Sequence, residues 1–326
     1  MKNENSRVNL QLIVFPEVSE IEKFITRSIG KKVQVTHINV LRHRDFSFVA
    51  RVFIHPHFRS LVGFDTLIYK KVKAPWDCEA NIALYVKNSG LPHTARLIEI
   101  SKAPITAQFL QEDLGELSLM IRNSHKLALE TGRRLAEIHL MAKSATAELP
   151  EKLERFDSAK SIVELAADCY YKLHEHFADF DRLLALQMVG CAVRDAQKLT
   201  EGDMCFQHGD VYAENIMLRQ TSLAPTFIDW SYFCFVGPQL YDLATLTSAH
   251  SKNRALFKRR DAVIQGYCDV AQMPVEAVKE MLPAAFRFSR LMFLKWLLVR
   301  VDMGITQTTV GPVRPLIDRV VQEIIG

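Results

Sequence analysis

The chain has 326 residues and a mass of 37.2 kDa, more than one small hydrophobic core requires, so two lobes or domains are expected. Apolar residues make up 48% of the sequence and charged residues 24%, a balance that excludes disordered and fibrous proteins. The formal net charge is only +4, and the basic residues are not interleaved with aromatic ones, so nucleic acid is not an expected partner.

The distribution of apolar, cysteine and basic residues further limits the classes of protein to which the chain can belong. The polar start of the chain, and Lys295 within its most apolar late stretch, predict neither a signal peptide nor a membrane span. Six scattered cysteines without a C-x-x-C pair disfavour a disulfide framework and a zinc site, so a reducing cytoplasm is expected. Residues 251–326 hold 12 Lys+Arg against 7 Asp+Glu, and the basic cluster that begins at Lys252 fits a solvated helical face better than a surface for an acidic partner.

The first third of the chain predicts a leading helix followed by a small antiparallel sheet. Residues 17–30 place apolar side chains at helical spacing and end on Gly30, a plausible C-cap. Alternating and β-branched runs then predict five strands. These strands lie within residues 33–40, 46–54, 67–70, 95–100 and 106–110.

The predicted turn between the first two strands, residues 41–47, contains no glycine. Glycine-rich loops let backbone N–H groups approach phosphates closely, so a nucleotide contact at this turn would fall to Ser47 or to the two arginines. Further on, His55 and His57 flank Pro56 at a spacing that two ligands of one metal could use. No third ligand lies nearby, and a loop is expected there instead.

Lys70 and Glu79 are the next candidates for chemistry. Lys70 ends the third strand on the same face as Ile68, whereas Lys71 must point to the other face. The alternative is a pair of exposed lysines. Glu79 opens a predicted helix over residues 79–85, and taken alone it would be an acid that interacts with the helix dipole.

The most informative stretch runs from Cys205 to Ala244. Asp210 follows His-Gly, Asn215 lies five residues on, and Asp229 follows a short apolar run. Two strands that turn at residues 220–225 would bring the amide of Asn215 and the carboxylate of Asp229 together. Transfer of a γ-phosphoryl group needs oxygen ligands for Mg²⁺ and a carboxylate that takes the acceptor's proton, and this segment supplies both.

Beyond Gly115 the sequence predicts helices, interrupted by this segment. The predicted helices are residues 127–141, two within 151–200, 256–271, 275–282, 283–301 and 317–325. His139, on the first of them, is expected to be a satisfied core histidine rather than a catalytic one.

The order of these elements resembles that of protein kinases, and more closely that of the aminoglycoside phosphotransferase and choline kinase-like family. The shared motifs are H-G-D-x-x-x-x-N at 208–215, I-D-W at 228–230 and D-L-A at 242–244. Protein kinases carry a lysine where this chain has Tyr212. The resemblance implies an α+β, bilobal, protein kinase-like fold: an N-terminal sheet lobe (1–110), a hinge (111–116) and a helical C-terminal lobe (117–326).

The resemblance also implies roles for individual residues. Asp210 would be the catalytic base, and Asn215 and Asp229 would hold Mg²⁺. The other implied contacts are Lys70, paired with Glu79, on the phosphates of ATP or GTP, Glu112 and Leu114 on the hinge strand beside the adenine, His208 and Asp242 as structural support, and Glu214 as a candidate acceptor contact.

Three functions remain open from the sequence. The first is a small-molecule kinase, monomeric or homodimeric, whose acceptor is an antibiotic, a sugar or an amino alcohol. The second is a protein kinase, which the short stretch from Ser231 to Tyr241 disfavours because it leaves no peptide platform. The third is a catalytically silent nucleotide-binding scaffold, suggested by the glycine-free turn.

Overall fold

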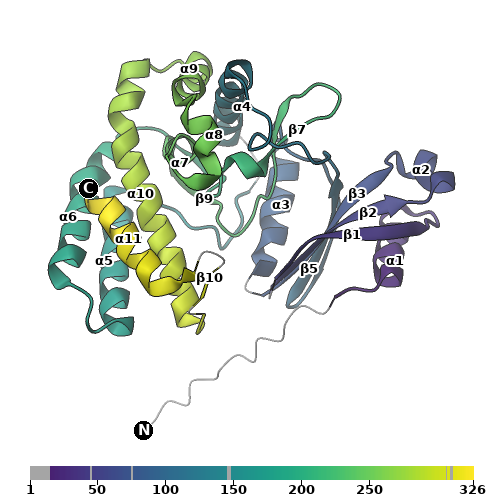
Figure 1. Cartoon of the computed structure of the whole chain (residues 1–326), viewed down its shortest axis with the longest axis horizontal. Coiled ribbons are helices and arrows are strands. Elements are labelled where there is room, and N and C mark those ends of the chain that lie inside the picture. Colours follow the sequence, from purple (N-terminus) through teal and green to yellow (C-terminus); the bar gives the residue numbers. More distant parts are fainter. Residues whose placement is uncertain (1–14, 45, 75, 145–147, 306, 309–310) are drawn as a thin grey trace, which may run out of the picture. The chain divides into compact units, whose positions relative to one another are not determined.

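The computed structural model describes residues 15–44, 46–74, 76–144, 148–305, 307–308 and 311–326 (Figure 1). The polar start of the chain, on which the absence of a signal peptide was argued, lies outside these residues. The contacts divide the chain into two units. Unit 1 comprises the described residues up to Asn88, Thr94–Gly115 and Trp230–Tyr232, and unit 2 comprises Ser89–His93, Glu116–Asp229 and Phe233–Gly326.

Unit 1 is built on the predicted five-stranded antiparallel sheet, whose strand order is β1-β2-β3-β5-β4. Its strands are β1 (Val35–Arg44), β2 (Ser47–Ile54), β3 (Thr66–Lys73), β4 (Leu97–Ala103) and β5 (Thr106–Glu112). The alternation of side chains along β3 sends Tyr69 and Lys71 to one face and Lys70 and Val72 to the other. Each face carries its own apolar cluster.

Two helices cover the two faces. Helix α1 (Val18–Ile29) packs Ile21, Phe24 and Ile25 against the face of Tyr69, and it ends as predicted at Gly30, whose φ of 70° is left-handed. Helix α3 (Glu79–Asn88), preceded by the single turn η1 (Trp76–Cys78), packs against the face of Val72.

Two local predictions in unit 1 were wrong. Strand β1 continues through Arg44, which pairs with Ser47, so the predicted seven-residue turn shrinks to residues 45–46, of which Asp45 lies outside the described residues. The predicted loop at residues 55–57 is the start of helix α2 (Pro56–Val62), in which His55 is the N-cap and Pro56 the first helical residue. Proline fits that position because the N–H it lacks would have no helical partner.

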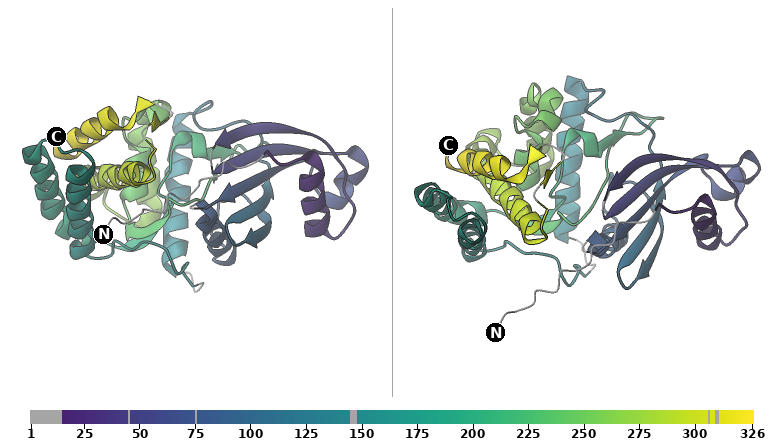
Figure 2. Two further views of the ribbon diagram at one scale, coloured as in Figure 1. Left: turned by 90° about the horizontal axis from the view of Figure 1, so that it is seen from below. Right: turned by 60° about the horizontal axis from the view of Figure 1, so that its bottom comes forward.

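Unit 2 is mainly helical, and its helices fall into two packed groups. In one group α10 lies against α5, α6 and α11 (Figure 2), and in the other α4 packs along α9. The principal helices are α4 (His125–Ser144), α5 (Ala159–His176), α6 (Arg182–Thr200), α7 (Tyr241–Leu246), α8 (Arg254–Phe257), α9 (Arg260–Ala271), α10 (Val275–Asp302) and α11 (Val313–Ile325).

Short strands and turns complete unit 2. Strand β6 (Met204–Gln207) pairs with β9 (Phe235–Pro238), β7 (Ile216–Leu218) pairs with β8 (Pro225–Phe227), and β10 (Gln307–Thr308) pairs with β11 (Gly311–Pro312). The turns η2 (Ala213–Asn215) and η3 (Ser251–Asn253) lie in the segments that follow β6 and α7. The β7–β8 pair is the hairpin predicted from the sequence.

Pro283 does not end a helix, contrary to the prediction of two helices on either side of it. Helix α10 runs through it without a break, and its buried face includes Phe288, Leu291 and Leu294. Pro283 itself is exposed, so the carbonyl that loses its helical donor can bind water. The packing of the following turns outweighs the cost of the proline.

No helix among the described residues is both long enough and apolar enough to cross a bilayer.

The contact between α4 and α9 depends on two glycines. A Cβ atom on Gly132 would lie 1.9 Å from the carbonyl oxygen of Val263, and one on Gly266 would lie 1.9 Å from that of Leu129. Each clash is with backbone and not with a flexible side chain, so an added methyl group forces the helices apart.

We therefore expect Gly132→Ala to destabilise the protein by about 3 kcal/mol, the upper range for overpacking, in equilibrium urea unfolding. Gly190→Ala is the matched control, because Gly190 lies within α6 with nothing within 4 Å of an added Cβ. This control should stabilise by about 0.5–1 kcal/mol through helix propensity. Equal effects of the two substitutions would contradict the close approach of α4 and α9.

Candidate active site

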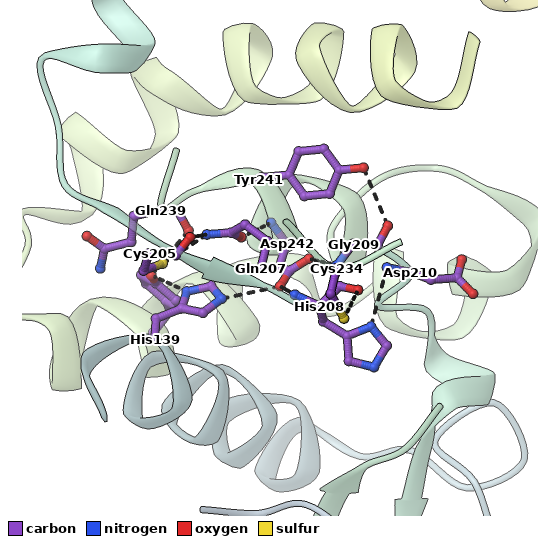
Figure 3. Close-up of polar contacts among 11 residues, drawn as sticks. His139, Cys205, Gln207, His208, Gly209, Asp210, Cys234, Gln239, Tyr241 and Asp242 are labelled. Atoms are coloured by element: carbon purple, nitrogen blue, oxygen red, sulfur yellow. Dashed lines mark hydrogen bonds and ion pairs between the residues drawn. The ribbon is translucent and has the colours of Figure 1, made fainter. Parts of the chain in front are cut away.

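The segment after β6 is held by one buried carboxylate, that of Asp242 at the start of α7. Its Oδ2 accepts the backbone N–H of His208 (2.7 Å), and its Oδ1 accepts that of Gly209 (2.9 Å) (Figure 3). Asp242 is fully buried, and a buried charge is tolerated when donors of this kind satisfy it. His139 reaches the same carboxylate at 3.3 Å.

Gly209 is the position in this turn that no other residue could fill without distortion. Its φ is 79°, in the left-handed region, and a Cβ atom there would lie 2.0 Å from the carbonyl oxygen of Phe233. Tyr241 donates its hydroxyl proton to the Gly209 carbonyl at 3.4 Å. The constrained turn therefore fixes the backbone position from which the Asp210 side chain extends.

His208 ties this turn to the end of β8. Its Nε2 lies 2.8 Å from the carbonyl oxygen of Ile228, and its Nδ1 accepts the backbone N–H of Asp210 at 3.3 Å. These contacts fit a neutral ring with the proton on Nε2, and burial lowers the pKa of His208, which favours that form. His208 thus supports the two segments that carry Asp210 and Asp229.

Asp210 and Asn215 lie in direct contact. The Asn215 side-chain amide donates to the Asp210 carboxylate oxygen Oδ2 at 3.1 Å and to its backbone carbonyl at 2.8 Å. Turn η2 makes this possible, because it folds residues 213–215 back toward the start of the loop. The amide nitrogen is used in this pair, so the amide oxygen of Asn215 remains the group that can bind a metal ion.

Asp229 follows the strand that pairs with the one after Asn215. The Ile228 N–H donates to the Asn215 carbonyl at 3.0 Å, and Ile216 pairs with Phe227, so the two chain segments run side by side. Asp229 has a φ of 62°, left-handed for a residue with a side chain. Strain of this kind is concentrated at functional sites, where the surrounding structure enforces it.

The environment changes the acidity of Asp210. Its pKa is raised to about 7, chiefly by burial and also by the charges of Asp229 and Glu214, against the opposing effects of the Lys252 charge and the hydrogen bond from Asn215. A carboxyl group that titrates near neutrality can both accept and release a proton at physiological pH.

Glu214 is engaged by a residue that sequence reasoning did not assign to the site. Its carboxylate accepts a hydrogen bond from the Lys252 ammonium, which also lies 5.1 Å from the centre of the Tyr212 ring. The sequence signal for this contact is the basic cluster that begins at Lys252, for which the sequence predicts a solvated helical face. Whether Glu214 contacts the acceptor stays a prediction.

His139 is the satisfied core histidine that the sequence predicted. It is 1% exposed, and its Nδ1 lies 2.9 Å from the Tyr267 hydroxyl while its Nε2 faces Asp242. It has no access to a reacting group, so its contribution is to pack α4 and α9 against the buried carboxylate.

In unit 1, Lys70 and Glu79 form the predicted ion pair. Their side chains are 8% and 5% exposed, and Lys70 Nζ lies 2.6 Å from Glu79 Oε2. Lys71, on the opposite face, pairs with Glu20 of α1 at 2.8 Å, as the alternation of side chains requires. Removing one partner of a buried pair such as Lys70–Glu79 leaves an uncompensated charge.

The predicted hinge begins where β5 ends. Asp113 forms a two-pronged ion pair with Arg51 of β2, at 2.6 and 3.2 Å, and Arg51 also donates to the Gly115 carbonyl at 2.9 Å. Glu112 accepts the Arg96 backbone N–H at 3.1 Å. Leu114 and Ser47 are buried, and the nucleotide contacts predicted for them stay predictions.

The candidate metal ligands are oxygen atoms. Among the described residues, no three His, Cys, Asp or Glu side chains gather as a metal site, and the stacked rings of His55 and His57 gain no third ligand there. The donors of Asn215 and Asp229 are an amide and a carboxylate oxygen, the type that Mg²⁺ prefers when phosphates and water complete its shell. The residues present therefore fit this ion.

Comparison with known proteins identifies the family. The model of the phosphotransferase enzyme family (APH) matches residues 79–278, which include Glu79, the catalytic segment and the start of α10. The chain belongs to the phosphotransferase enzyme family. No curated protein sequence matches the chain.

Solved structures place this family member among kinase-like folds at low sequence identity. A choline/ethanolamine kinase family protein from Mesorhizobium loti has a TM-score of 0.63 at 13% identity, over 88% of this chain and 86% of that one. Choline kinase from Cryptosporidium parvum Iowa II has 0.61 at 11%, over 94% and 95%. Spectinomycin phosphotransferase APH(9)-Ia, in complex with ADP and spectinomycin, has 0.60 at 13%, over 94% of both chains.

The raised pKa of Asp210 makes a prediction about stability. Because the folded-state pKa lies above the unfolded value of 3.8, protonation of Asp210 stabilises the fold fully below that value, and this contribution is lost as the pH rises through about 7. In a metal-free buffer we expect Asp210→Asn to raise Tm by a few degrees at pH 8, and the difference to disappear near pH 4.

Asp302→Asn is the control for this experiment, because the expected change in Tm at pH 8 has the opposite sign. Burial opposes ionisation of Asp302, but hydrogen bonds from Lys172 and His176 prevail and lower its pKa. This carboxylate stabilises the fold above the unfolded pKa and loses its effect as the pH falls through the lower folded value. Its replacement should lower Tm at pH 8. A Tm for Asp210→Asn below that of the wild type at pH 8 would contradict the account.

Proposed function

We propose that the chain is an ATP-dependent kinase that transfers the γ-phosphoryl group to a hydroxyl group of a small molecule. The observation that carries this proposal is the grouping in unit 2 of a carboxylate, an amide and a second carboxylate. Asp210 and Asn215 are hydrogen-bonded to each other, and Asp229 directly follows Ile228, whose backbone N–H donates to the Asn215 carbonyl. Membership of the phosphotransferase family supports the reaction type.

Asp210 is the proposed catalytic base. It would accept the proton of the acceptor hydroxyl as the new O–P bond forms, while the bond between the γ-phosphorus and the bridging oxygen breaks and ADP leaves. Its pKa of about 7 suits both steps of this cycle, because the proton must then pass from Asp210 to solvent. Asn215 holds the carboxylate in place through its amide hydrogen atoms.

Asn215 and Asp229 are the proposed Mg²⁺ ligands. When bound, the ion would neutralise phosphate charge that otherwise opposes transfer. In unit 1, Lys70 is proposed to contact the α- and β-phosphates, with Glu79 fixing the direction of its side chain. ATP is the expected nucleotide, with GTP as the alternative. The similar phosphotransferase complexed with ADP supports nucleotide binding.

The acceptor is proposed to be a small molecule and not a protein. After Asp229, the chain enters β9 at Phe235 and α7 at Tyr241, so residues 230–240 leave no long segment for a peptide substrate. The similar proteins named for choline, ethanolamine and spectinomycin support an amino alcohol or an antibiotic as the acceptor class, and a sugar is the third class proposed. A cytoplasmic enzyme without nucleic-acid or membrane partners, monomeric or homodimeric, is the form proposed here.

We expect Asp210→Asn to lower turnover by about 10²–10⁴-fold while nucleotide binding persists, because the variant keeps the shape of the side chain and loses the base. The assay incubates the protein with ATP, Mg²⁺ and a pool of metabolites and antibiotics, and mass spectrometry detects any compound that gains one phosphoryl group.

Asp269→Asn is the control, since Asp269 forms an exposed ion pair with Arg133 on α4, remote in sequence from the catalytic segment. It should leave turnover unchanged. Turnover of Asp210→Asn within tenfold of the wild type would refute the assignment of the base.

A further inference from the structure

The catalytic loop, defined as residues 205–218, contains neither lysine nor arginine, and Tyr212 stands where the related protein-kinase loop has a lysine. The γ-phosphoryl group carries negative charge throughout its transfer, and a positioned cation beside it stabilises the transition state. A cation for this purpose would have to come from another element.

Lys252, on turn η3, places its ammonium group against this loop. It donates a hydrogen bond to Glu214 and lies 5.1 Å from the centre of the Tyr212 ring, so its charge stands over the side chain that replaces the lysine. Burial opposes the charge of Lys252, but the hydrogen bond to Glu214 and the charges of Asp210 and Glu214 prevail and raise its pKa. Lys252 is therefore protonated at neutral pH.

The backbone that carries Lys252 is fixed to the same loop. Asn253 is fully buried, accepts the Ala213 N–H at 3.0 Å and donates to the Thr245 carbonyl at 2.7 Å. The Lys252 N–H donates to His250 Nδ1 at 3.2 Å. Turn η3 and the catalytic loop thus form one hydrogen-bonded assembly, which limits the freedom of the lysine.

The partner of Lys252 distinguishes it from other paired lysines, because Glu214 lies in the turn that ends at Asn215. Lys198 is the matched comparison. It pairs with Glu280 at 3.2 Å, its side chain is as exposed as that of Lys252, and the pair joins α6 to α10 without a residue of the catalytic loop.

We propose that Lys252 is a catalytic residue whose ammonium group contacts the γ-phosphoryl group during transfer and supplies, from η3, the cation that the loop lacks. The inference rests on the proposed function. The bonds formed and broken are those given above for Asp210, and Lys252 keeps its proton throughout.

The test uses water as the acceptor. Hydrolysis of [γ-³²P]ATP with Mg²⁺ is followed in single-turnover reactions with enzyme in excess, for the wild type, Lys252→Met, Lys252→Arg and Lys198→Met. We expect Lys252→Met to be slower by at least about 100-fold, the lower end of the range for loss of one transition-state contact, with its Kd for ATP changed less than threefold. Lys252→Arg should be at least tenfold faster than Lys252→Met, and Lys198→Met should match the wild type.

A smaller loss in Lys252→Met, a Kd that rises in proportion to the loss, or no recovery in Lys252→Arg would overturn the role of Lys252. If Lys252→Met does not fold, Lys252→Gln replaces it under the same criteria. The proposed function fails separately, together with this inference, if the wild type does not hydrolyse ATP or if Asp210→Asn hydrolyses it equally well. A hydrolysing wild type, an inactive Asp210→Asn and a fully active Lys252→Met would contradict Lys252 alone.

Discussion

The buried carboxylate of Asp242 is the interaction on which the geometry of the candidate site depends. Two consecutive backbone N–H groups, those of His208 and Gly209, end on its two oxygens, and His139 packs against it from α4. Because a buried charge is costly without such donors, the turn before Asp210 has one favourable conformation. That conformation directs the His208 ring to the end of β8 and thereby couples the positions of two segments that are distant in sequence.

The same region contains features that lower the stability of the folded state. Asp210 is partly buried beside two other carboxylates, and its pKa of about 7 means that the ionised form destabilises the folded state. Asp229 adopts a left-handed backbone conformation, and Gly209 is confined against Phe233. Backbone strain and grouped carboxylates of this kind persist when the surrounding structure enforces them and when a bound ligand is stabilised by them. In the proposed kinase the ligand is the acceptor and the magnesium–nucleotide complex.

Patterns that repeat locally were readable from the sequence. Alternation along β3 predicted the opposite directions of Lys70 and Lys71, and the short apolar runs predicted the β7–β8 hairpin. Lys252 was not predicted because its contact with the loop is tertiary and because it begins a cluster of basic residues that extends to Arg260. The sequence predicted a helix end at Pro283 because proline in a helix interior removes a backbone hydrogen bond. In α10 the packing of the following turns outweighs that loss, and the helix continues. Helix α2 was missed since a single proline can start a helix or belong to a loop, and nothing near Pro56 distinguishes the two.

The proposed mechanism depends on Asn215 and Asp229 holding one divalent ion together with a nucleotide. The most direct measurement is electron paramagnetic resonance of Mn²⁺, which can replace Mg²⁺ at oxygen ligands, titrated with the protein in the presence of ADP. We expect the signal of free Mn²⁺ to fall on binding to the wild type, and Asp229→Asn to bind the ion at least about tenfold more weakly. Equal binding by the wild type and Asp229→Asn would contradict the proposed mechanism.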